Sequence, residues 1–128
     1  MVGGAGTLEA APGAQLMESP QFPDTSKPEA QEHRDALAVY RASAGDLNWT
    51  VIGPAADFQP GERTGRHRTS GDQLPVDEQG RSHISFEDYA DALVDELERP
   101  GGGKPVGSSP GTRFAGGRMT VCFLRGTR

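Results

Sequence analysis

The sequence predicts an α/β fold, specifically the C-terminal part of a doubly wound parallel sheet. Two observations predict it: helical patterns at residues 27–43 and from Ser85 to a Pro100–Gly101 stop, and a strand-like run at 47–54 directly behind the first helix. A helix that leads into an apolar strand is half of a parallel α/β repeat. We therefore expect a buried strand with helices beside it, from a domain only partly present in this sequence.

The first helix has a start signal, a periodic apolar face and a stop signal. Ser26-Lys27-Pro28-Glu29 matches a capping box, in which the serine oxygen and the glutamate each bind a free amide at the helix start. Gly45 supplies the left-handed stop. The apolar positions recur near helical spacing: Ala30, Leu37, Tyr40 and Ala44, with Ala36 and Val39 beside them.

The strand-like run Leu47–Pro54 is rich in β-branched and aromatic residues and ends in Gly53-Pro54. In parallel α/β sheets, ligands sit beyond the carboxyl ends of the strands. This rule places Pro54, Ala55 and Ala56 at the ligand edge.

The segment from Asp57 to Gly80 is polar and rich in turn signals, so we expect an irregular lobe with a possible short strand at Gln73–Val76. A brief strand at Ser82–Ile84 precedes the second helix, which Ser85 caps. The apolar stripe of that helix should comprise Phe86, Tyr89, Ala90, Leu93, Val94 and Leu97. Its solvated acidic face should comprise Glu87, Asp91, Asp95 and Glu98.

The two ends of the chain differ in character. Met1–Gly6 has the pattern of the end of a buried strand followed by a glycine turn, and Thr7–Thr25 that of a loop with at most a brief hairpin. We expect residues 101–118 to form a flexible, disordered linker, because they are rich in glycine, proline and serine. Residues 119–128 combine a possible terminal strand with a basic tail. The chain thus divides into a domain portion, 1–100, a linker and a terminal segment.

Composition restricts the function classes. With 34% hydrophobic residues, 18 Gly and 10 Pro among 128 positions, the core should be small. The net charge of −5 disfavours nucleic acids and anionic membranes as partners. Cys122 is the only cysteine, which excludes an intrachain disulfide, and neither a membrane span nor a signal peptide is visible. We expect a soluble, cytoplasmic protein.

Several segments together carry a family resemblance. They are Gly3-Gly4-Ala5-Gly6, the Lys27-Pro28-Glu29-Ala30 helix start, Leu47–Ala56, Pro60–Gly65, Ile84–Ala90 and Asp95–Glu98. From Val2 to about Pro100 the chain resembles the NAD(P)H-binding, atypical short-chain dehydrogenase/reductases, in the subgroup called NADH-flavin reductase-like or NAD(P)-dependent epimerase-like. The resemblance implies the C-terminal portion of a Rossmann-like domain.

The resemblance also implies a cofactor and a place for it. The cofactor would be NAD(P)H, with its nicotinamide end near Gly4, Ala5 and the Pro54-Ala55-Ala56 edge. Lys27 could approach a ribose, although an exposed first-turn lysine is the alternative reading. Strand pairing at an exposed edge of the Trp49 strand would permit self-association.

The chain departs from the family at two motifs that carry its chemistry. The family's GxxGxxG turn binds the pyrophosphate, and here neither Gly3–Gly6 nor Gly101–Lys104 has the required spacing. A Tyr-x-x-x-Lys pair is also absent, because Tyr40 and Tyr89 have Ala44 and Leu93 four residues on. Whether the chain is an enzyme therefore stays open, and no catalytic residue is assigned.

Two other constellations are weaker. His33, His67 and His83 are widely spaced, so structural or solvated histidines are favoured over a metal site. The basic run Arg63–Arg68 could bind a phosphate, including the 2′-phosphate of NADP, but a solvated turn is favoured.

Three hypotheses follow. The first is an NAD(P)H-binding oxidoreductase-like protein without its N-terminal nucleotide-binding half, weakly active or inactive alone. The second is a non-enzymatic regulatory or binding module built on the same fold. The third is a gene fragment, which the abrupt change of composition after residue 100 suggests.

Overall fold

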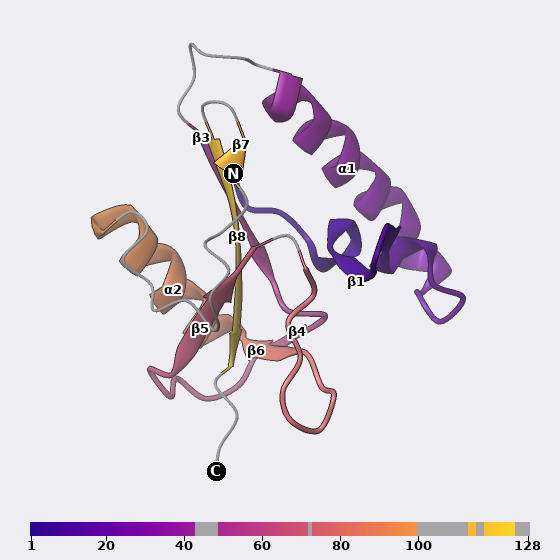
Figure 1. Ribbon diagram of the computed structural model, residues 1–128. Coiled ribbons are helices and arrows are strands. Elements are labelled where there is room, and N and C mark those ends of the chain that lie inside the picture. Colours follow the sequence, from indigo (N-terminus) through magenta and orange to yellow (C-terminus); the bar gives the residue numbers. More distant parts are fainter. Residues whose placement is uncertain (43–48, 72, 100–112, 115–116, 125–128) are drawn as a thin grey trace.

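The computed structural model describes residues 1–42, 49–71, 73–99, 113–114 and 117–124 (Figure 1). Two longer helices and a set of short strands follow one another along the chain. In order they are η1 (Ala5–Thr7), β1 (Glu9–Ala11), β2 (Ala14–Gln15), η2 (Leu16–Glu18), η3 (Asp24–Ser26), α1 (Lys27–Ala42), β3 (Trp49–Pro54), β4 (Asp57–Gln59), β5 (His67–Ser70), β6 (His83–Ser85), α2 (Phe86–Glu98), β7 (Arg113–Phe114) and β8 (Gly117–Leu124).

A parallel sheet is built around β3, as the sequence predicts. β3 pairs in parallel with β8, and a parallel bridge joins Val2 to Ile52 on its other side. β5 runs antiparallel to β8, and β7 forms a hairpin with it. The terminal strand expected at 119–124 is therefore confirmed. The Trp49 strand has a parallel neighbour on each side, β8 along its length and a single bridge from Val2 at Ile52, so the exposed edge that we expected is largely paired. Self-association stays a prediction.

The main sheet lies between two helices. Figure 1 shows α1 and α2 on opposite sides of β3. Trp49 and Val51 of β3 belong to the hydrophobic cluster with Leu37 of α1, whereas Ile52 belongs to the cluster with Tyr89 of α2. Because alternate side chains of a strand point to opposite faces, β3 supplies both cores. This three-layer arrangement is that of a doubly wound sheet.

Helix α1 begins differently from the prediction. The helix itself is confirmed, but the 3-10 turn η3 leads into it, and among the described residues no amide donates a hydrogen bond to the Ser26 hydroxyl. Asp24 Oδ1 and Lys27 Nζ, 2.7 Å apart, form an ion pair across this turn. The stop predicted at Gly45 lies outside the described residues.

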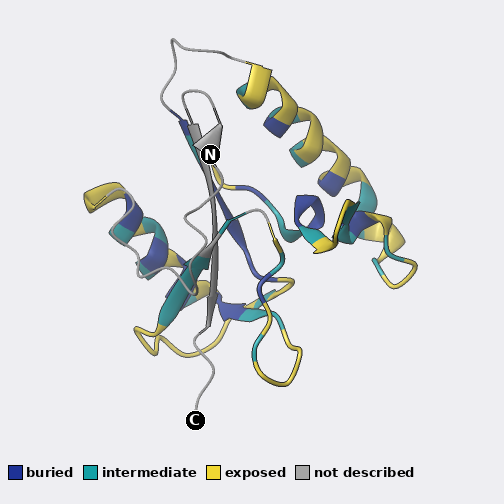
Figure 2. Cartoon of the chain, in the orientation of Figure 1, coloured by how far each residue is buried: buried dark blue, intermediate teal, exposed yellow. Residues whose placement is uncertain are grey.

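Helix α2 is also confirmed, including its Ser85 cap, whose hydroxyl accepts the Asp88 amide at 3.0 Å. The predicted apolar stripe is wrong in part. Leu97 is 74% exposed, and Phe86, Ala90 and Val94 are also exposed, while Asp88 is fully buried. Figure 2 shows that α2 carries both buried and exposed residues. The physical reason is that the loop between β4 and β5 donates hydrogen bonds to Asp88, so this face of the helix packs inward.

The segment 57–80 is more regular than predicted. It contains β4, which pairs in parallel with β6, and β5, which joins the main sheet. The strand expected at Gln73–Val76 is reduced to a bridge between Gln73 and Glu9, beside which the Leu74 amide donates to the Glu9 carbonyl at 2.8 Å.

The two ends of the chain agree with prediction only in part. The hairpin expected in 7–25 is present as β1 and β2, whose turn places Gly13 at φ 74°. Val2 is in a parallel bridge but is 52% exposed rather than buried. Of the predicted linker, 113–114 and 117–118 are in strands. Its remaining residues and the basic tail 125–128 lie outside the described residues.

Candidate functional site

A cleft of about 330 Å³ lies at the carboxyl ends of two parallel segments, Met1–Gly3 and β3. On one side it is lined by Gly4, Ala5 and Gly6, which follow the first segment. On the other it is lined by Pro54, Ala55 and Ala56, which end or follow β3. This is the edge at which parallel α/β sheets bind ligands, and the volume is at the lower end of that of small-molecule sites.

Five of the six residues predicted to bind the cofactor are brought together here: Gly4, Ala5, Pro54, Ala55 and Ala56. Lys27 is not among the lining residues, and its ammonium group is paired with Asp24. That pair lowers the pKa of the Asp24 carboxyl, first through the hydrogen bond and then through the positive charge. Cofactor binding by these residues stays a prediction.

The end of η3 and helix α1 contribute polar side chains to the cleft that the sequence analysis did not assign to it. Ser26 of η3 and Glu29 and His33 of α1 all line the cleft. Their spacing of three and four residues places them on one side of a helix. The spacing can be read from the sequence, but it identifies a site only because the Gly4 turn lies against His33 in the structure.

The Gly4 turn and the α1 face are in close contact. A Cβ built on Gly4 would lie 2.7 Å from His33 Nδ1, and one built on Gly6 would lie 2.7 Å from the Ala30 Cβ. Both distances are too short for real carbon atoms. Glycine at both positions therefore lets the turn approach the helix this closely.

Apolar side chains complete the lining of the cleft. They come from the N-terminal loop, from α1 and from β4: Leu16, Phe22, Pro23, Ala30 and Phe58. A mainly apolar cleft with a few polar groups is typical of a small-molecule site.

Neither tyrosine of the chain reaches this cleft. The buried Tyr89 hydroxyl donates to the Ile52 carbonyl at 2.7 Å, and the Tyr40 ring packs 5.8 Å from that of Trp49. Both side chains thus have structural contacts in the two cores, which agrees with the absence of the Tyr-x-x-x-Lys pair.

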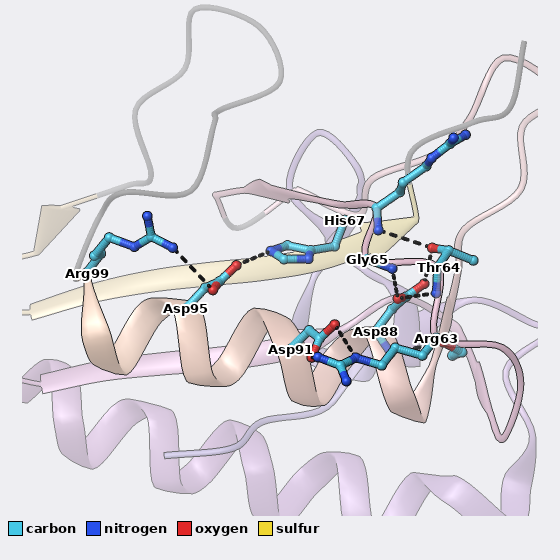
Figure 3. A network of polar contacts seen from close by, with 10 residues as sticks. Arg63, Thr64, Gly65, His67, Asp88, Asp91, Asp95 and Arg99 are labelled. Atoms are coloured by element: carbon cyan, nitrogen blue, oxygen red, sulfur yellow. Dashed lines mark hydrogen bonds and ion pairs between the residues drawn. The ribbon is translucent and has the colours of Figure 1, made fainter.

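The basic run Arg63–Arg68 lies along α2 (Figure 3), and Arg63–Arg66 are exposed to solvent, as expected of a solvated turn. Arg63 binds Asp91, with Nη2 and Oδ1 2.9 Å apart, and His67 Nε2 lies 3.4 Å from Asp95 Oδ2. The hydrogen bond from Arg63 is the main cause that lowers the pKa of Asp91, and the same bond raises the pKa of Arg63. Figure 3 also shows Asp88 beneath Thr64 and Gly65.

The acidic face of α2 was therefore wrongly predicted to be purely solvated. Besides Asp91 and Asp95, Glu87 is partnered, since its Oε2 accepts the Gly61 amide at 2.9 Å. The guanidinium of Arg63 is already engaged by a carboxylate, which weakens the alternative that this run binds a phosphate.

The described residues contain no group of three His, Cys, Asp or Glu side chains arranged to hold a metal ion. None of the helices in the described part is long and apolar enough to cross a membrane.

The chain is similar to several known proteins. No family model matches it. It is 40% identical over 103 residues to the uncharacterized protein YwnB of Bacillus subtilis, an alignment that covers 78% of this chain and 48% of YwnB. The chain thus spans about half the length of the curated relative it matches.

Solved structures show the same partial coverage. A Bacteroides thetaiotaomicron protein described as a "putative epimerase" has a TM-score of 0.80 and 35% identity, over 100% of this chain and 53% of that one. A Streptococcus pneumoniae protein described as a "putative NADH-flavin reductase" has a TM-score of 0.78 and 35% identity, over 97% and 54%. A Burkholderia pseudomallei protein described as a "putative exported protein" has a TM-score of 0.76 and 48% identity, over 96% and 53%. The Bacteroides and Streptococcus proteins have the NAD(P)-binding, Rossmann-like fold.

Proposed function

We propose that this chain is the substrate-side half of an NAD(P)H-binding, reductase- or epimerase-like protein, and that the nicotinamide end of the nucleotide lies in the cleft between Gly4 and Ala56. The observation that carries the proposal is the position of five predicted residues around one cleft at the carboxyl edge of parallel strands. The descriptions of two structural neighbours, which name an epimerase and an NADH-flavin reductase, support the same assignment.

The grip of this chain on the nucleotide should be weak. A GxxGxxG turn between a strand and a helix normally holds the pyrophosphate, and the sequence has none at that spacing. The chain also spans only about half of its relatives. We therefore propose weak binding of NADH or NADPH and weak turnover by the chain alone.

Titration calorimetry with NADPH, NADH, nicotinamide mononucleotide and ADP tests this proposal. We expect weak, saturable binding of the three ligands that carry nicotinamide and weaker binding of ADP. Ala56 is exposed and lines the cleft, so Ala56→Trp should fill the site and abolish binding without disturbing the core. Ala90→Trp, at an exposed position on α2 that does not line the cleft, is the matched control.

Three results would contradict the proposal. Absence of saturable binding would remove the cofactor site, and equal binding by Ala56→Trp would place it elsewhere. Tight binding of NADPH would show that the chain already contains a complete nucleotide-binding site.

A non-enzymatic binding module is the second candidate function. It is favoured by the engagement of Tyr89 with Ile52 and of Tyr40 with Trp49, which leaves neither tyrosine for proton transfer. Measurable reduction of an acceptor by NADPH, dependent on Ala56, would exclude it. A cytoplasmic location remains part of the proposal, although one structural neighbour is described as exported.

A further inference from the structure

We propose that His33 is the proton donor of the cleft, acting on a carbonyl substrate that receives a hydride from the nicotinamide. This inference rests on the proposed function and adds the class of substrate and the residue that would replace the absent tyrosine.

The position of His33 is the first argument. Its half-buried side chain lines the cleft from α1, opposite Pro54–Ala56. Its ring lies against Gly4, because a Cβ built there would be 2.7 Å from Nδ1 and 3.2 Å from Cε1. Gly4 directly follows the segment paired with β3. The imidazole thus lies at the strand ends where the nicotinamide is proposed.

The anchoring of α1 is the second argument. Ala30 and Leu37, one turn before and one turn after His33, are buried against the N-terminal loop and β3. Packing on both sides of His33 along the helix keeps its side chain in a fixed direction. A proton donor needs such a fixed direction, because it must lie close to the reacting atom.

Among the polar side chains of the cleft, His33 is the one suited to donate a proton. The polar side chains in the cleft lining are those of Ser26, Glu29 and His33. A serine hydroxyl is a poor acid, and a carboxylate cannot donate a proton while ionised. Imidazole can carry a proton and release it near neutral pH, as general acids in enzymes do.

The histidines of the described residues also differ in their partners. His67 and His83 pair with Asp95 and Asp57 and do not line the cleft. No hydrogen bond or ion pair of the His33 ring is found within the described residues. His33 is therefore the histidine whose ring nitrogens remain for a ligand.

Reduced nicotinamide bound in the cleft would supply a hydride from its C4–H bond to the carbonyl carbon and would itself become oxidised. As the π electron pair of the carbonyl moves to its oxygen, that oxygen takes the N–H proton of the His33 imidazolium, and the carbonyl becomes an alcohol. Water at the open cleft returns a proton to the neutral imidazole.

The experiment compares two hydride acceptors with the whole chain and NADPH. 4-Nitrobenzaldehyde needs a proton on its oxygen, whereas flavin mononucleotide can accept the hydride and delocalise the resulting charge. We expect His33→Gln to lower kcat for the aldehyde at least about tenfold, since general acids contribute about 10²–10⁴-fold. The Kd for NADPH should stay within twofold, and flavin reduction should change less than aldehyde reduction.

Two controls accompany this comparison. His83→Gln, outside the cleft, should leave both reactions unchanged. In His33→Ala, free imidazole should restore aldehyde reduction, because the cleft is open to solvent, and a purely structural role would not permit such rescue.

Several outcomes would overturn the proposed role of His33. Equal loss with both acceptors, no loss, or no imidazole rescue would overturn the proton role. The same holds if wild-type chain binds NADPH but does not reduce the aldehyde. If the wild-type chain binds no nicotinamide nucleotide at all, the proposed function itself fails, and calorimetry distinguishes that result from failure of His33 alone.

Discussion

Asp88 of α2 accepts two hydrogen bonds from Thr64, which lies in the loop between β4 and β5. The Thr64 hydroxyl donates to Oδ2 at 2.6 Å and its amide donates to Oδ1 at 2.9 Å, and the Gly65 amide also donates to Oδ1 at 2.9 Å. Asp88 is fully buried, so this carboxylate depends on these donors for the solvation that water would otherwise give.

Removing this carboxylate should be costly. Asp88→Ala leaves the loop amides without their acceptor, and we expect a loss of about 3 kcal/mol in the free energy of unfolding. Asp88→Asn keeps one acceptor oxygen and should lose less than half as much. Urea unfolding followed by circular dichroism measures both, and equal stability of Asp88→Ala and wild type would refute the structural role.

The Arg63–Asp91 pair should make stability depend on pH. Because Arg63 lowers the folded-state pKa of Asp91 below 3.8, the ionised carboxylate stabilises the fold above the unfolded-state value of about 3.9. This contribution is lost as the pH falls through the lower folded-state pKa. The gap in urea midpoint between wild type and Asp91→Asn should therefore be constant from pH 7 to 5 and close below about pH 4. A gap that persists unchanged at pH 2 would contradict this assignment.

Gly4→Ala should damage the cleft more than the fold. The backbone at Gly4 is extended, at φ −122° and ψ 166°, so any residue can adopt it and the effect is steric. The new methyl group must displace the His33 ring, and we expect about tenfold weaker NADPH binding with about 1 kcal/mol lost in stability.

Gly53→Ala is the matched control for Gly4→Ala. A Cβ at Gly53 would lie 3.6 Å from the Gly4 carbonyl oxygen, an ordinary contact. Calorimetric titration should separate the two variants, and identical affinities would show that the Gly4–His33 contact does not shape the ligand site.

Tyr89→Phe should affect stability but not ligand binding. The lost hydrogen bond to the Ile52 carbonyl should cost about 1 kcal/mol, since that carbonyl keeps the Gly3 amide as a donor at 2.8 Å. NADPH affinity and any reductase turnover should equal those of wild type. A variant that keeps full stability but loses turnover would instead make Tyr89 part of the chemistry.

The helices and the central strand could be predicted from sequence because their signals are local. The apolar spacing around Leu37, the Ser85 cap and the β-branched run ending at Pro54 each act within a few residues. The ligand edge followed from chain order, since a strand that follows a helix in a parallel sheet ends at a known edge. For this reason Pro54, Ala55 and Ala56 could be named in advance.

Other features could not be predicted because they join residues far apart in the chain. β5 is a strand because it pairs with β8, more than 50 residues later, and Asp88 faces inward because Thr64 and Gly65 meet it there. Lys27 was assigned to the site on resemblance, but its neighbour Asp24 binds it first.

By itself, then, the sequence determined the α/β class, two helices, a parallel strand and the edge at which a ligand would lie, since each depends on short-range pattern. Tertiary structure alone decided which polar side chains meet at that edge. His33 had the pattern of a solvated helix residue until the Gly4 turn, 29 positions earlier in the sequence, was found against its ring. Such contacts arise from packing of one element on another, and periodicity along a single element carries no information about them.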